Sequence, residues 1–517
     1  MAENEKAARP DLRDMEVLVL GIGASGAAAA RLLLREGARV RCSDSGSGPE
    51  TLRAAASLEA LGCRVETGGH TEGFARGVSL AVISPGIDPS IPVARRLAAD
   101  GAAPISEIEL AYAFCDRPLI AVTGTNGKTT TVTLIERILR ADGRRAEACG
   151  NIGTPFSECV ARRGAADIFV LEASSFQLEA VRSFRPRVAV ALNISPDHLG
   201  RHRTAGEYAA AKAAIFMNQR AGDWAIVRSG DRPGWERHGL RRGQEILEFS
   251  AGGGVSRGAW VEGGAIVVAV GGAREEICGA GELRVEGAHN IENALAAAAA
   301  AAACGARPEA ARRALLEFRG LPHRLEPAGE LRGVSFVNDS KATNPDAALR
   351  AIESAKGPVV LIAGGLDKGF DYSTLRGAVE RKVKGIVLIG EAGPKMARDL
   401  EGAAPIRFAG TLAEAVRIAS GEAAPGDTVM LSPACSSYDM FRNYEERGDA
   451  FKREVARLIG VGAAGGAAPI RGSGGSASRA RGTKGGSHEQ GEACGGGGGC
   501  ARLRAGVACV DGRVRPR

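Results

Sequence analysis

A run of ten residues, Ala-Val-Thr-Gly-Thr-Asn-Gly-Lys-Thr-Thr at 121–130, constrains this chain more than any other stretch. It ends an apolar strand-like segment and precedes a helix-like one at 131–140. Glycines at such a turn let backbone N–H groups converge on an anion in front of the helix N-terminus. The pattern resembles a phosphate-binding loop that has two residues between its glycines where the common form has four. We therefore predict an ATP-binding domain of the α/β class.

The chemistry of the loop assigns roles to its residues and to polar residues that follow later strands. Lys128 is expected to reach the terminal phosphates, and the Thr129 hydroxyl to bind Mg²⁺. Glu172 ends the apolar segment 167–171 and is a second candidate magnesium ligand, while His198 follows the segment 187–194. All should converge at the carboxyl ends of parallel strands. The remaining loop residues should cradle the phosphates: Gly124, Thr125, Asn126, Gly127 and Thr130.

Strand-like and helix-like segments alternate up to residue 460, which predicts three consecutive α/β domains with mostly parallel sheets. We place a Rossmann-like domain at 1–105 and a central P-loop ATPase-like domain at 106–320. A C-terminal Rossmann-like domain follows at 321–460, with a hinge at 320–324 where it begins.

The net charge of +7 lies almost entirely in the last segment, 461–517, which has nine Arg and Lys residues against three acidic ones. This Gly/Ser/Arg-rich tail has too little apolar content to fold, and we predict that it is disordered. A basic tail leaves contact with RNA or anionic lipid open, although aromatic residues for base stacking are missing. The near-neutral body gives no reason to expect a nucleic-acid partner.

The remaining composition predicts a soluble cytoplasmic protein. The charged start of the chain is no signal peptide, and the longest apolar run, 294–304, is far shorter than the roughly 20 residues that cross a bilayer. Eight cysteines before residue 461 are scattered singly, which favours reduced thiols in packing roles. We expect a monomer that does not contact membranes.

The first domain opens with Gly-Ile-Gly-Ala-Ser-Gly at 21–26 directly after an apolar strand, with Asp44 following the next strand. This is the spacing of a dinucleotide-binding turn. A later strand ends at Ser84-Pro85-Gly86, at the same sheet edge. A nicotinamide-dependent oxidoreductase would explain this turn but none of the motifs that follow it in the chain. That alternative therefore stays open for the first domain alone.

Several motifs together resemble the Mur ligase family, and within it the members that add D-glutamate. The resemblance runs in order over about residues 14–460, and the tail has no counterpart in it. An Asp-Asn-Pro-Arg signature, which marks the relatives that add a diamino acid, is absent. The motifs lie at 124–130, 171–179, 197–198, 289–293, 320–324, 338–344 and 432–449.

The resemblance implies an ATP-dependent amide-bond ligase of peptidoglycan precursor synthesis that acts on UDP-N-acetylmuramoyl-L-alanine and D-glutamate. The first domain would then hold the uridine nucleotide of the sugar substrate instead of a dinucleotide. ATP would lie between the second and third domains, near Asn293, Arg324 and Asp339. The implied contacts of the sugar nucleotide are Ala24, Ser25, Asp44, Ser84, Pro85, Gly86 and Asn151.

A second Mg²⁺ would be held through His198 and a carbamylated Lys212, so that both residues join Lys128 in catalysis. A lysine whose amine is neutral can react with CO₂, which turns a cation into a carboxylate-like ligand. An ordinary solvated lysine is the alternative for Lys212. The resemblance assigns D-glutamate to Lys341, Thr343, Lys368, Ser437 and Tyr444, the last at a position where the family often has Phe.

Two further alternatives stay open. One is another ligase of the same architecture that uses a different amino acid, either a Mur-type ligase or a folylpolyglutamate-synthetase-like ligase. The latter attaches L-glutamate to a pterin, but that branch lacks an N-terminal uridine-nucleotide domain. The basic tail also allows a nucleic-acid-associated NTPase.

Overall fold

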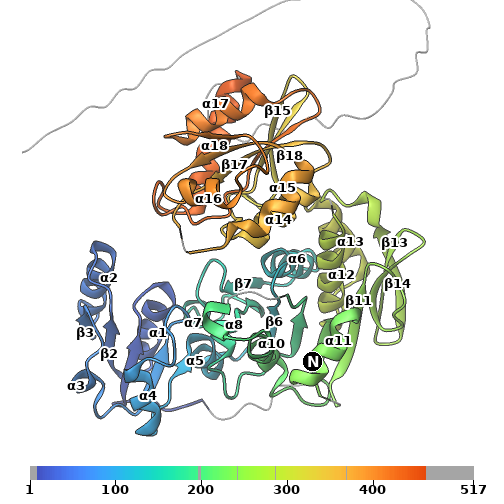
Figure 1. Ribbon diagram of the computed structural model, residues 1–517. Helices are drawn as coiled ribbons and strands as arrows, with labels where there is room; N and C mark the ends of the chain where they lie inside the picture. The colour runs from blue at the N-terminus through green and yellow to red at the C-terminus, as the bar shows by residue number, and fades with distance from the viewer. Residues whose placement is uncertain (1–8, 196–198, 242, 286, 368, 461–517) are drawn as a thin grey trace, which may run out of the picture. The chain divides into compact units, whose positions relative to one another are not determined.

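The computed structural model describes residues 9–195, 199–241, 243–285, 287–367 and 369–460. Three β-sheets, built mostly of parallel strands and flanked by helices, follow one another along the chain (Figure 1). The predicted α/β class and the three consecutive sheets are therefore confirmed. The tail at 461–517 lies outside the described residues. The domain boundaries at 105, 320 and 460 stay predictions, and β5 ends one residue beyond the first of them.

The first sheet has the strand order β3-β2-β1-β4-β5, and all its strands run parallel. Its glycine turn is sterically fixed, because a Cβ at Gly26 would lie 1.8 Å from the carbonyl oxygen of Gly21. The elements are β1 (Glu16–Leu20), α1 (Ala24–Arg35), β2 (Arg39–Asp44), α2 (Pro49–Glu59), β3 (Arg64–Thr67), α3 (Glu72–Ala75), β4 (Leu80–Ile83), α4 (Pro92–Ala99) and β5 (Ile105–Ser106).

The second sheet has the order β14-β13-β12-β11-β10-β9-β6-β8-β7. Its strands are parallel from β7 to β12, and β12, β13 and β14 pair antiparallel at the edge. The first half contains α5 (Glu107–Phe114), β6 (Leu119–Thr123), α6 (Lys128–Ala141), β7 (Ala146–Gly150), α7 (Phe156–Ala161), β8 (Ile168–Glu172), α8 (Ser175–Leu178), β9 (Val188–Ala191), α9 (Leu199–His202) and α10 (Ala205–Ala213). The second half contains η1 (Ala214–Phe216), β10 (Trp224–Arg228), η2 (Ser229–Asp231), α11 (Arg232–His238), β11 (Glu245–Ser250), β12 (Gly258–Glu262), β13 (Ala265–Val270), β14 (Ala273–Gly279), η3 (Ala280–Glu282), α12 (Ala288–Ala303) and α13 (Pro308–Glu317).

The alternation of side chains along the strands divides the second domain's core into two layers. Ile168 and Val170 of β8 pack with α6, α12 and α13, whereas Phe169 and Leu171 point to the opposite face with α5 and α7. That second layer continues into the first domain, because buried residues of α1 belong to the same apolar cluster. The first two sheets thus share one hydrophobic core through α1, α5 and α7.

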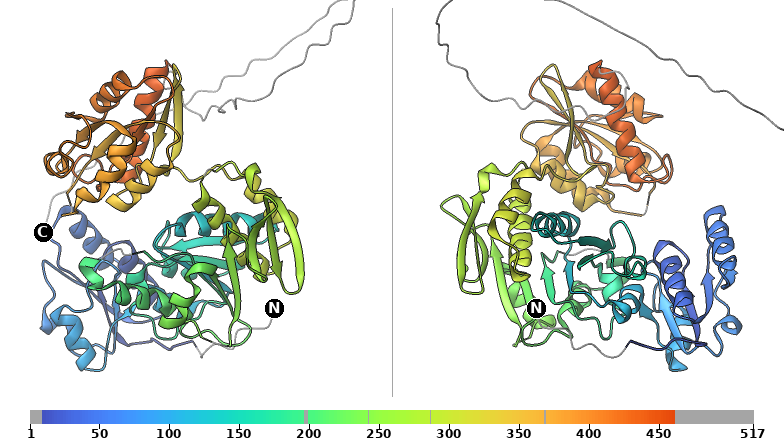
Figure 2. Two further views of the ribbon diagram at one scale, coloured as in Figure 1. Left: turned by 45° about the vertical axis from the view of Figure 1, so that its right-hand side comes forward. Right: turned by 180° about the vertical axis from the view of Figure 1, so that it is seen from behind.

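The third sheet has the order β15-β16-β20-β17-β18-β19, parallel except for the edge strand β15. Helices α14 and α15 pack on one face, and α17 and α18 on the other (Figure 2). The elements are β15 (Glu326–Leu331), β16 (Val334–Asn338), α14 (Pro345–Ser354), β17 (Val359–Gly364), η4 (Tyr372–Leu375), α15 (Arg376–Lys382), β18 (Val383–Ile389), α16 (Gly393–Asp399), β19 (Ile406–Phe408), α17 (Leu412–Glu422), β20 (Thr428–Leu431) and α18 (Tyr444–Ile459).

Among the described residues, no helix combines the length and the apolar character needed to cross a bilayer. The eight cysteines in this part of the chain are all buried and form no disulfide, which agrees with the packing role predicted for them.

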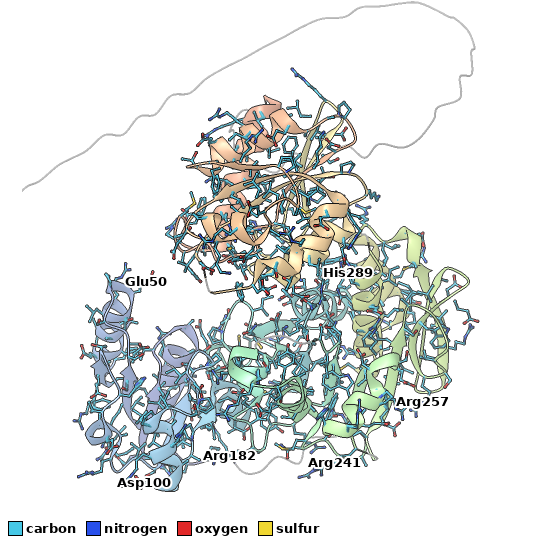
Figure 3. The ribbon with its side chains drawn as sticks, in the orientation of Figure 1. Glu50, Asp100, Arg182, Arg241, Arg257 and His289 are labelled. Carbon is cyan, nitrogen blue, oxygen red and sulfur yellow. The ribbon has the colours of Figure 1, made fainter. Side chains whose placement is uncertain are left out.

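Two buried carboxylates on α5, those of Glu107 and Glu109, differ in the number of hydrogen bonds that they accept. Glu109 accepts hydrogen bonds from the backbone N–H groups of Arg182, Ser183 and Phe184 at 3.0, 2.7 and 2.9 Å; Arg182 is labelled in Figure 3. Glu107 accepts one from the Ser157 N–H at 2.5 Å, and its second oxygen has no partner among the described residues. Burial raises the pKa of Glu107 to about 7.

We predict that Glu109→Gln lowers the free energy of unfolding by about 2–4 kcal/mol, because an amide NH₂ then faces donors that a carboxylate satisfied. The matched change on the same helix, Glu107→Gln, keeps a carbonyl acceptor for Ser157 and should cost far less. Urea unfolding midpoints of the two variants and the wild type measure the difference.

The pH dependence separates the two variants further. Because the folded-state pKa of Glu107 lies above its ordinary value of 4.5, the wild type loses stability as pH rises from about 4.5 through 7. Glu107→Gln cannot ionise, so its stability relative to the wild type should increase between pH 5.5 and 8. Equal losses for both variants at both pH values would contradict this account of the α5 carboxylates.

Candidate active site

The phosphate-binding loop connects the end of β6 to the first residue of α6, as the sequence predicts. Gly124 and Gly127 both have positive φ angles, of 149° and 84°, and Gly127 is the N-cap of α6. A Cβ at Gly127 would lie 2.2 Å from the side-chain oxygen of Asn293. The loop therefore packs directly against α12. With a side chain at position 127, α6 and α12 could not lie as close together as they do.

Asn293 and Asn193 fix the loop from two directions. The Thr131 hydroxyl donates to Asn293 Oδ1 at 3.3 Å, and Asn293 is buried on the first turns of α12, where Figure 3 labels its neighbour His289. Asn193 accepts from the Asn126 N–H at 3.0 Å and donates to the Asn126 carbonyl at 3.2 Å. Asn193 was not among the predicted residues. The sequence could have indicated it, because Asn193 is a polar residue that follows β9 at the carboxyl end of a parallel strand.

A hydroxyl and a carboxylate meet beside the loop in a way that suits magnesium. The Thr129 hydroxyl donates to Glu172 Oε2 at 2.9 Å, and Asn151 Nδ2 donates to Glu172 Oε1 at 2.9 Å. Glu172 is 3 % exposed. Mg²⁺ takes oxygen ligands and usually combines one or two protein groups with phosphate oxygens and waters. Thr129 and Glu172 fit that requirement, and the described residues contain no group of three or more His, Cys, Asp or Glu side chains arranged to hold a metal ion.

Two lysines converge on one carbonyl of the loop. Lys128 Nζ donates to the carbonyls of Gly124 and Thr125 at 2.8 and 2.9 Å, and Lys212 Nζ donates to that of Gly124 at 2.8 Å. Lys212 is 2 % exposed and lies 4.6 Å from the ring centroid of Tyr208, one turn earlier on α10. Tyr208 in turn donates to the Thr125 hydroxyl at 3.1 Å. Lys212 is thus buried against the loop, and the alternative of a solvated helix lysine does not fit its 2 % exposure.

A buried histidine and an arginine on α9 join this neighbourhood and were not predicted. His202 is 4 % exposed, with Nε2 at 3.0 Å from the Ser175 hydroxyl and Nδ1 at 3.1 Å from a Glu179 oxygen. Burial lowers the pKa of His202. Arg201 donates to Glu179 at 2.8 Å and to the carbonyl of Pro85 at 3.3 Å. Arg201 therefore connects the central domain to the predicted sugar-nucleotide loop, a contact that no sequence pattern signals.

The predicted residues of the first domain gather at the carboxyl ends of β1, β2 and β4. Asp44 accepts from the backbone N–H groups of Ile22 and Gly46, each at 2.8 Å. The Ser84 hydroxyl donates to the carbonyl of Gly21 at 2.9 Å. Both side chains hold the glycine turn in place, and Ala24 and Ser25 begin α1 directly after it. Pro85 and Gly86 follow Ser84 beyond the end of β4.

In the third domain, Asp339 follows β16 and is buried next to the end of β20. It accepts from the Ser432 hydroxyl at 2.9 Å and from the Leu325 N–H at 3.2 Å. Burial raises the pKa of Asp339 to about 7, against the opposing effects of Ser432 and of Arg324. The Nε of Arg324 is buried without a hydrogen-bond partner in the described part of the chain. An anionic ligand would satisfy it.

Lys341 and Tyr444 lie together near the same end of the sheet. Lys341 Nζ is 5.3 Å from the ring centroid of Tyr444. Burial and the Arg324 charge lower the pKa of Lys341, and the Glu172 carboxylate partly opposes them. Thr343 is half-buried two residues after Lys341, its N–H donating to the Lys341 carbonyl at 2.9 Å. Ser437 is 2 % exposed in the loop after β20.

Arg447 is the structural centre of these loops and was not predicted. It is 1 % exposed, and its guanidinium donates to the carbonyls of Ser340, Cys435 and Ser436 at 2.8, 3.1 and 3.2 Å. It thereby joins the loop after β16 to the loop that carries Ser437. His198 and Lys368, which were predicted to bind metal and D-glutamate, lie outside the described residues.

Three family models match successive parts of the chain. They are described as "Mur ligase MurD-like, N-terminal domain" over residues 15–106, "Mur ligase middle domain" over 122–301 and "Mur ligase, glutamate ligase domain" over 323–435. Together they follow the three sheets in order.

Curated relatives match over most of their length. A UDP-N-acetylmuramoylalanine–D-glutamate ligase of Pelotomaculum thermopropionicum is 44 % identical over 451 residues, which is 87 % of this chain and 99 % of the relative. A ligase of the same name from Chlorobaculum tepidum is 45 % identical over 470 residues, with coverage of 87 % and 99 %.

Solved structures share the fold at lower identity. The UDP-N-acetylmuramate–alanine ligase of Thermotoga maritima superposes with a TM-score of 0.53 at 19 % identity, covering 86 % of this chain and 99 % of that one. A pseudomurein peptide ligase of Methanothermus fervidus gives 0.52 at 18 % identity, with coverage of 86 % and 100 %.

We predict that Gly127→Ala weakens nucleotide binding by at least about tenfold, because the new Cβ would collide with Asn293. In addition, an alanine held at a positive φ costs about 1–2 kcal/mol relative to glycine. Gly143→Ala is the matched control, since Gly143 follows α6 with a φ of 88° and nothing within 4 Å of a Cβ. Calorimetric titration with MgATP measures both variants. Equal affinities for the two would show that the closeness of α12 to the loop does not matter for binding.

Proposed function

The chain belongs to the Mur ligase family, and from that premise we propose that it joins D-glutamate to UDP-N-acetylmuramoyl-L-alanine in an ATP-dependent reaction of peptidoglycan precursor synthesis. The observation that carries the proposal is the arrangement at the loop. Lys128 and Lys212 share the Gly124 carbonyl, and Thr129 meets Glu172 one residue away from Lys128. The names and the coverage of the curated relatives supply the substrates.

The reaction must first activate a carboxylate, because an amine does not displace an oxide from a carboxylate ion. The alanyl carboxylate attacks the γ-phosphorus of ATP, ADP leaves, and an acyl phosphate forms. Two anions approach each other in this step, and the Lys128 ammonium lowers their repulsion. Mg²⁺, when bound by Thr129 and Glu172, supplies further charge neutralisation at the phosphates.

The second step forms the amide bond. The neutral amine of D-glutamate attacks the acyl carbon, a tetrahedral intermediate collapses, and inorganic phosphate leaves with the electrons of the broken C–O bond. We assign the D-glutamate carboxylates to donors of the third domain, namely Lys341, Thr343, Lys368 and Ser437, with Tyr444 beside them. Arg324, with its unpartnered Nε, and Asp339 and Asn293 are assigned to ATP.

The sugar nucleotide is assigned to the glycine turn of the first domain, at Ala24, Ser25, Asp44, Ser84, Pro85 and Gly86, with Asn151 on the central domain. Arg201, at 3.3 Å from the Pro85 carbonyl and 2.8 Å from Glu179, supports this placement, because it links the segment after β4 to the central domain.

Two of the alternatives lose their support. A nicotinamide-dependent oxidoreductase accounts for none of the residues around Lys128. A folylpolyglutamate-synthetase-like ligase does not account for residues 15–106, which match an N-terminal domain model of Mur ligases. We further propose that the protein is a monomer and that it acts in the cytoplasm, where its nucleotide substrates are made.

We predict that phosphate release from ATP requires both UDP-N-acetylmuramoyl-L-alanine and D-glutamate. L-Glutamate, L-lysine and diaminopimelate should give only background release, because the donors that we assign to the third domain would bind the two carboxylates of D-glutamate, and none of these amino acids presents two carboxylates in the same arrangement. A coupled phosphate assay with each amino acid in turn measures this. Turnover with another amino acid would overturn the assignment of D-glutamate, and release without the sugar nucleotide would overturn the ligase itself.

We propose that Lys212 is carbamylated in the active enzyme and helps to hold a second Mg²⁺ with His198. Lys212→Ala should lower kcat by about 100-fold or more, and added formate or acetate should restore part of the activity by supplying a carboxylate. Lys128→Ala is the matched control, because its lost ammonium cannot be replaced by a carboxylate. Rescue of both variants, or of neither, would contradict carbamylation.

A further inference from the structure

A depression with a volume of about 640 Å³ lies between α1 and the end of α7. Four arginines and one carboxylate contribute to its wall: Arg31 and Arg35 from α1, Arg162 and Arg163 from the turn after α7, and Glu158 from α7. The rest of the lining is small and apolar or glycine. We call it the α1–α7 depression, and it contains none of the residues assigned to the ligase reaction.

Arginines on both sides of the α1–α7 depression have donors to spare. Arg31 is exposed and makes no hydrogen bond or ion pair within the described residues. Arg162 approaches the carboxylates of Glu147 and Glu158 only at 3.4 and 4.0 Å. Arg35 donates to the Ala161 carbonyl at the end of α7, and Arg163 pairs with Glu36 at 3.2 Å.

A second depression, of about 410 Å³, adjoins the first through Ala165 and adds Arg140, Arg144 and Arg145 with Glu147. Each of these arginines pairs with an acidic residue, namely Glu136, Asp142 and Asp167 respectively, so the second depression adds little net positive charge. The residues before 461 carry almost no net charge as a whole, because the surplus lies in the tail. Of the arginines along this surface, Arg31 and Arg35 have no acidic partner among the described residues, so the surplus positive charge lies on the α1 side of the α1–α7 depression.

The chemistry of this wall selects its ligand. The planar guanidinium fork matches the oxygens of phosphate bidentately. No aromatic side chain lines either depression, so nothing would stack on a base. The volume is typical of sites for small molecules, and a concave site between two helices suits a short chain better than a flat membrane. We propose that the α1–α7 depression binds an oligophosphate, a chain of two or more phosphates, either free or as the tail of a nucleotide.

Such a ligand would also link the first two domains. Arg31 and Arg35 belong to the first sheet's helix α1, and Arg162 and Arg163 follow α7 of the second domain. The ligand would accept hydrogen bonds from arginines on both sides of this seam and would compensate the charges of Arg31 and Arg35, which have no acidic partner in the described part of the chain. Binding to the folded state alone then raises the melting temperature with ligand concentration.

Calorimetric titration of the full chain with inorganic tripolyphosphate tests the proposal. The titration uses the Lys128→Ala background, which weakens binding at the catalytic loop. We expect one class of site, a higher melting temperature in its presence, and an affinity at least tenfold lower after Arg31→Ala with Arg162→Ala. The control pair is Arg53→Ala with Arg95→Ala, which removes the same charge from exposed positions on α2 and α4 and leaves the basic tail unchanged. It should shift the affinity less than twofold.

The other outcomes are also decisive. Absence of tripolyphosphate binding in the Lys128→Ala background would overturn the proposal, and so would binding that the Arg31 and Arg162 changes leave intact. ATP bound much more tightly than tripolyphosphate, and lost with the same pair, would identify a nucleotide tail as the source. Binding to phosphatidylglycerol vesicles that depends on this pair, without tripolyphosphate binding, would overturn the proposal in favour of a membrane surface. The ligase assay is independent of these results.

Discussion

Two lysine ammonium groups that donate to one backbone carbonyl, that of Gly124, are the interaction on which the site depends. With Lys212 unmodified they place two positive charges in front of the N-terminus of α6, where the backbone N–H groups add a further positive field; carbamylation of Lys212 would leave the charge of Lys128 and that field in place. Such a concentration of positive charge is suited to the phosphates of a nucleotide. The neighbouring carboxylate of Glu172 accepts one hydrogen bond from Thr129 and one from Asn151, whereas both lysines donate to the carbonyl of Gly124.

The strand register explains why these groups meet. Val122 of β6 is opposite Glu172 of β8, and Thr123 is opposite Ala191 of β9. The three strands therefore end at the same level: the loop with Lys128 follows β6, Glu172 is the last residue of β8, and the segment with Asn193 follows β9. In a parallel sheet all carboxyl ends share one edge, so the sequence distance between the strands does not matter. The same logic brings Asp339 to Ser432 at the ends of β16 and β20.

This regularity also decides what could be predicted from the sequence. The loop, Glu172 and the glycine turn of the first domain follow from local rules, because each is a polar or glycine residue directly after an apolar strand. Arg447 and Arg201 follow from no such rule, since their partners are backbone carbonyls on distant loops. The shared core of the first two domains was also not predictable. It depends on which faces of α1, α5 and α7 meet. Helix α5 is buried on nearly all of its residues, the carboxylates of Glu107 and Glu109 included, so its sequence does not show which side faces the core.

The tyrosine at position 444, where the family often has phenylalanine, shows how the structure resolves a departure in the sequence. The Tyr444 ring offers its π-system to the Lys341 ammonium at 5.3 Å, an attraction that a phenylalanine ring would also supply. Burial and the neighbouring Glu445 raise the pKa of the Tyr444 hydroxyl, so it stays protonated and adds no charge. The exchange thus leaves the electrostatics around Lys341 unchanged and adds only a neutral hydrogen-bonding group. A site that recognises a dicarboxylate through positive charge has little reason to change its preference on that account.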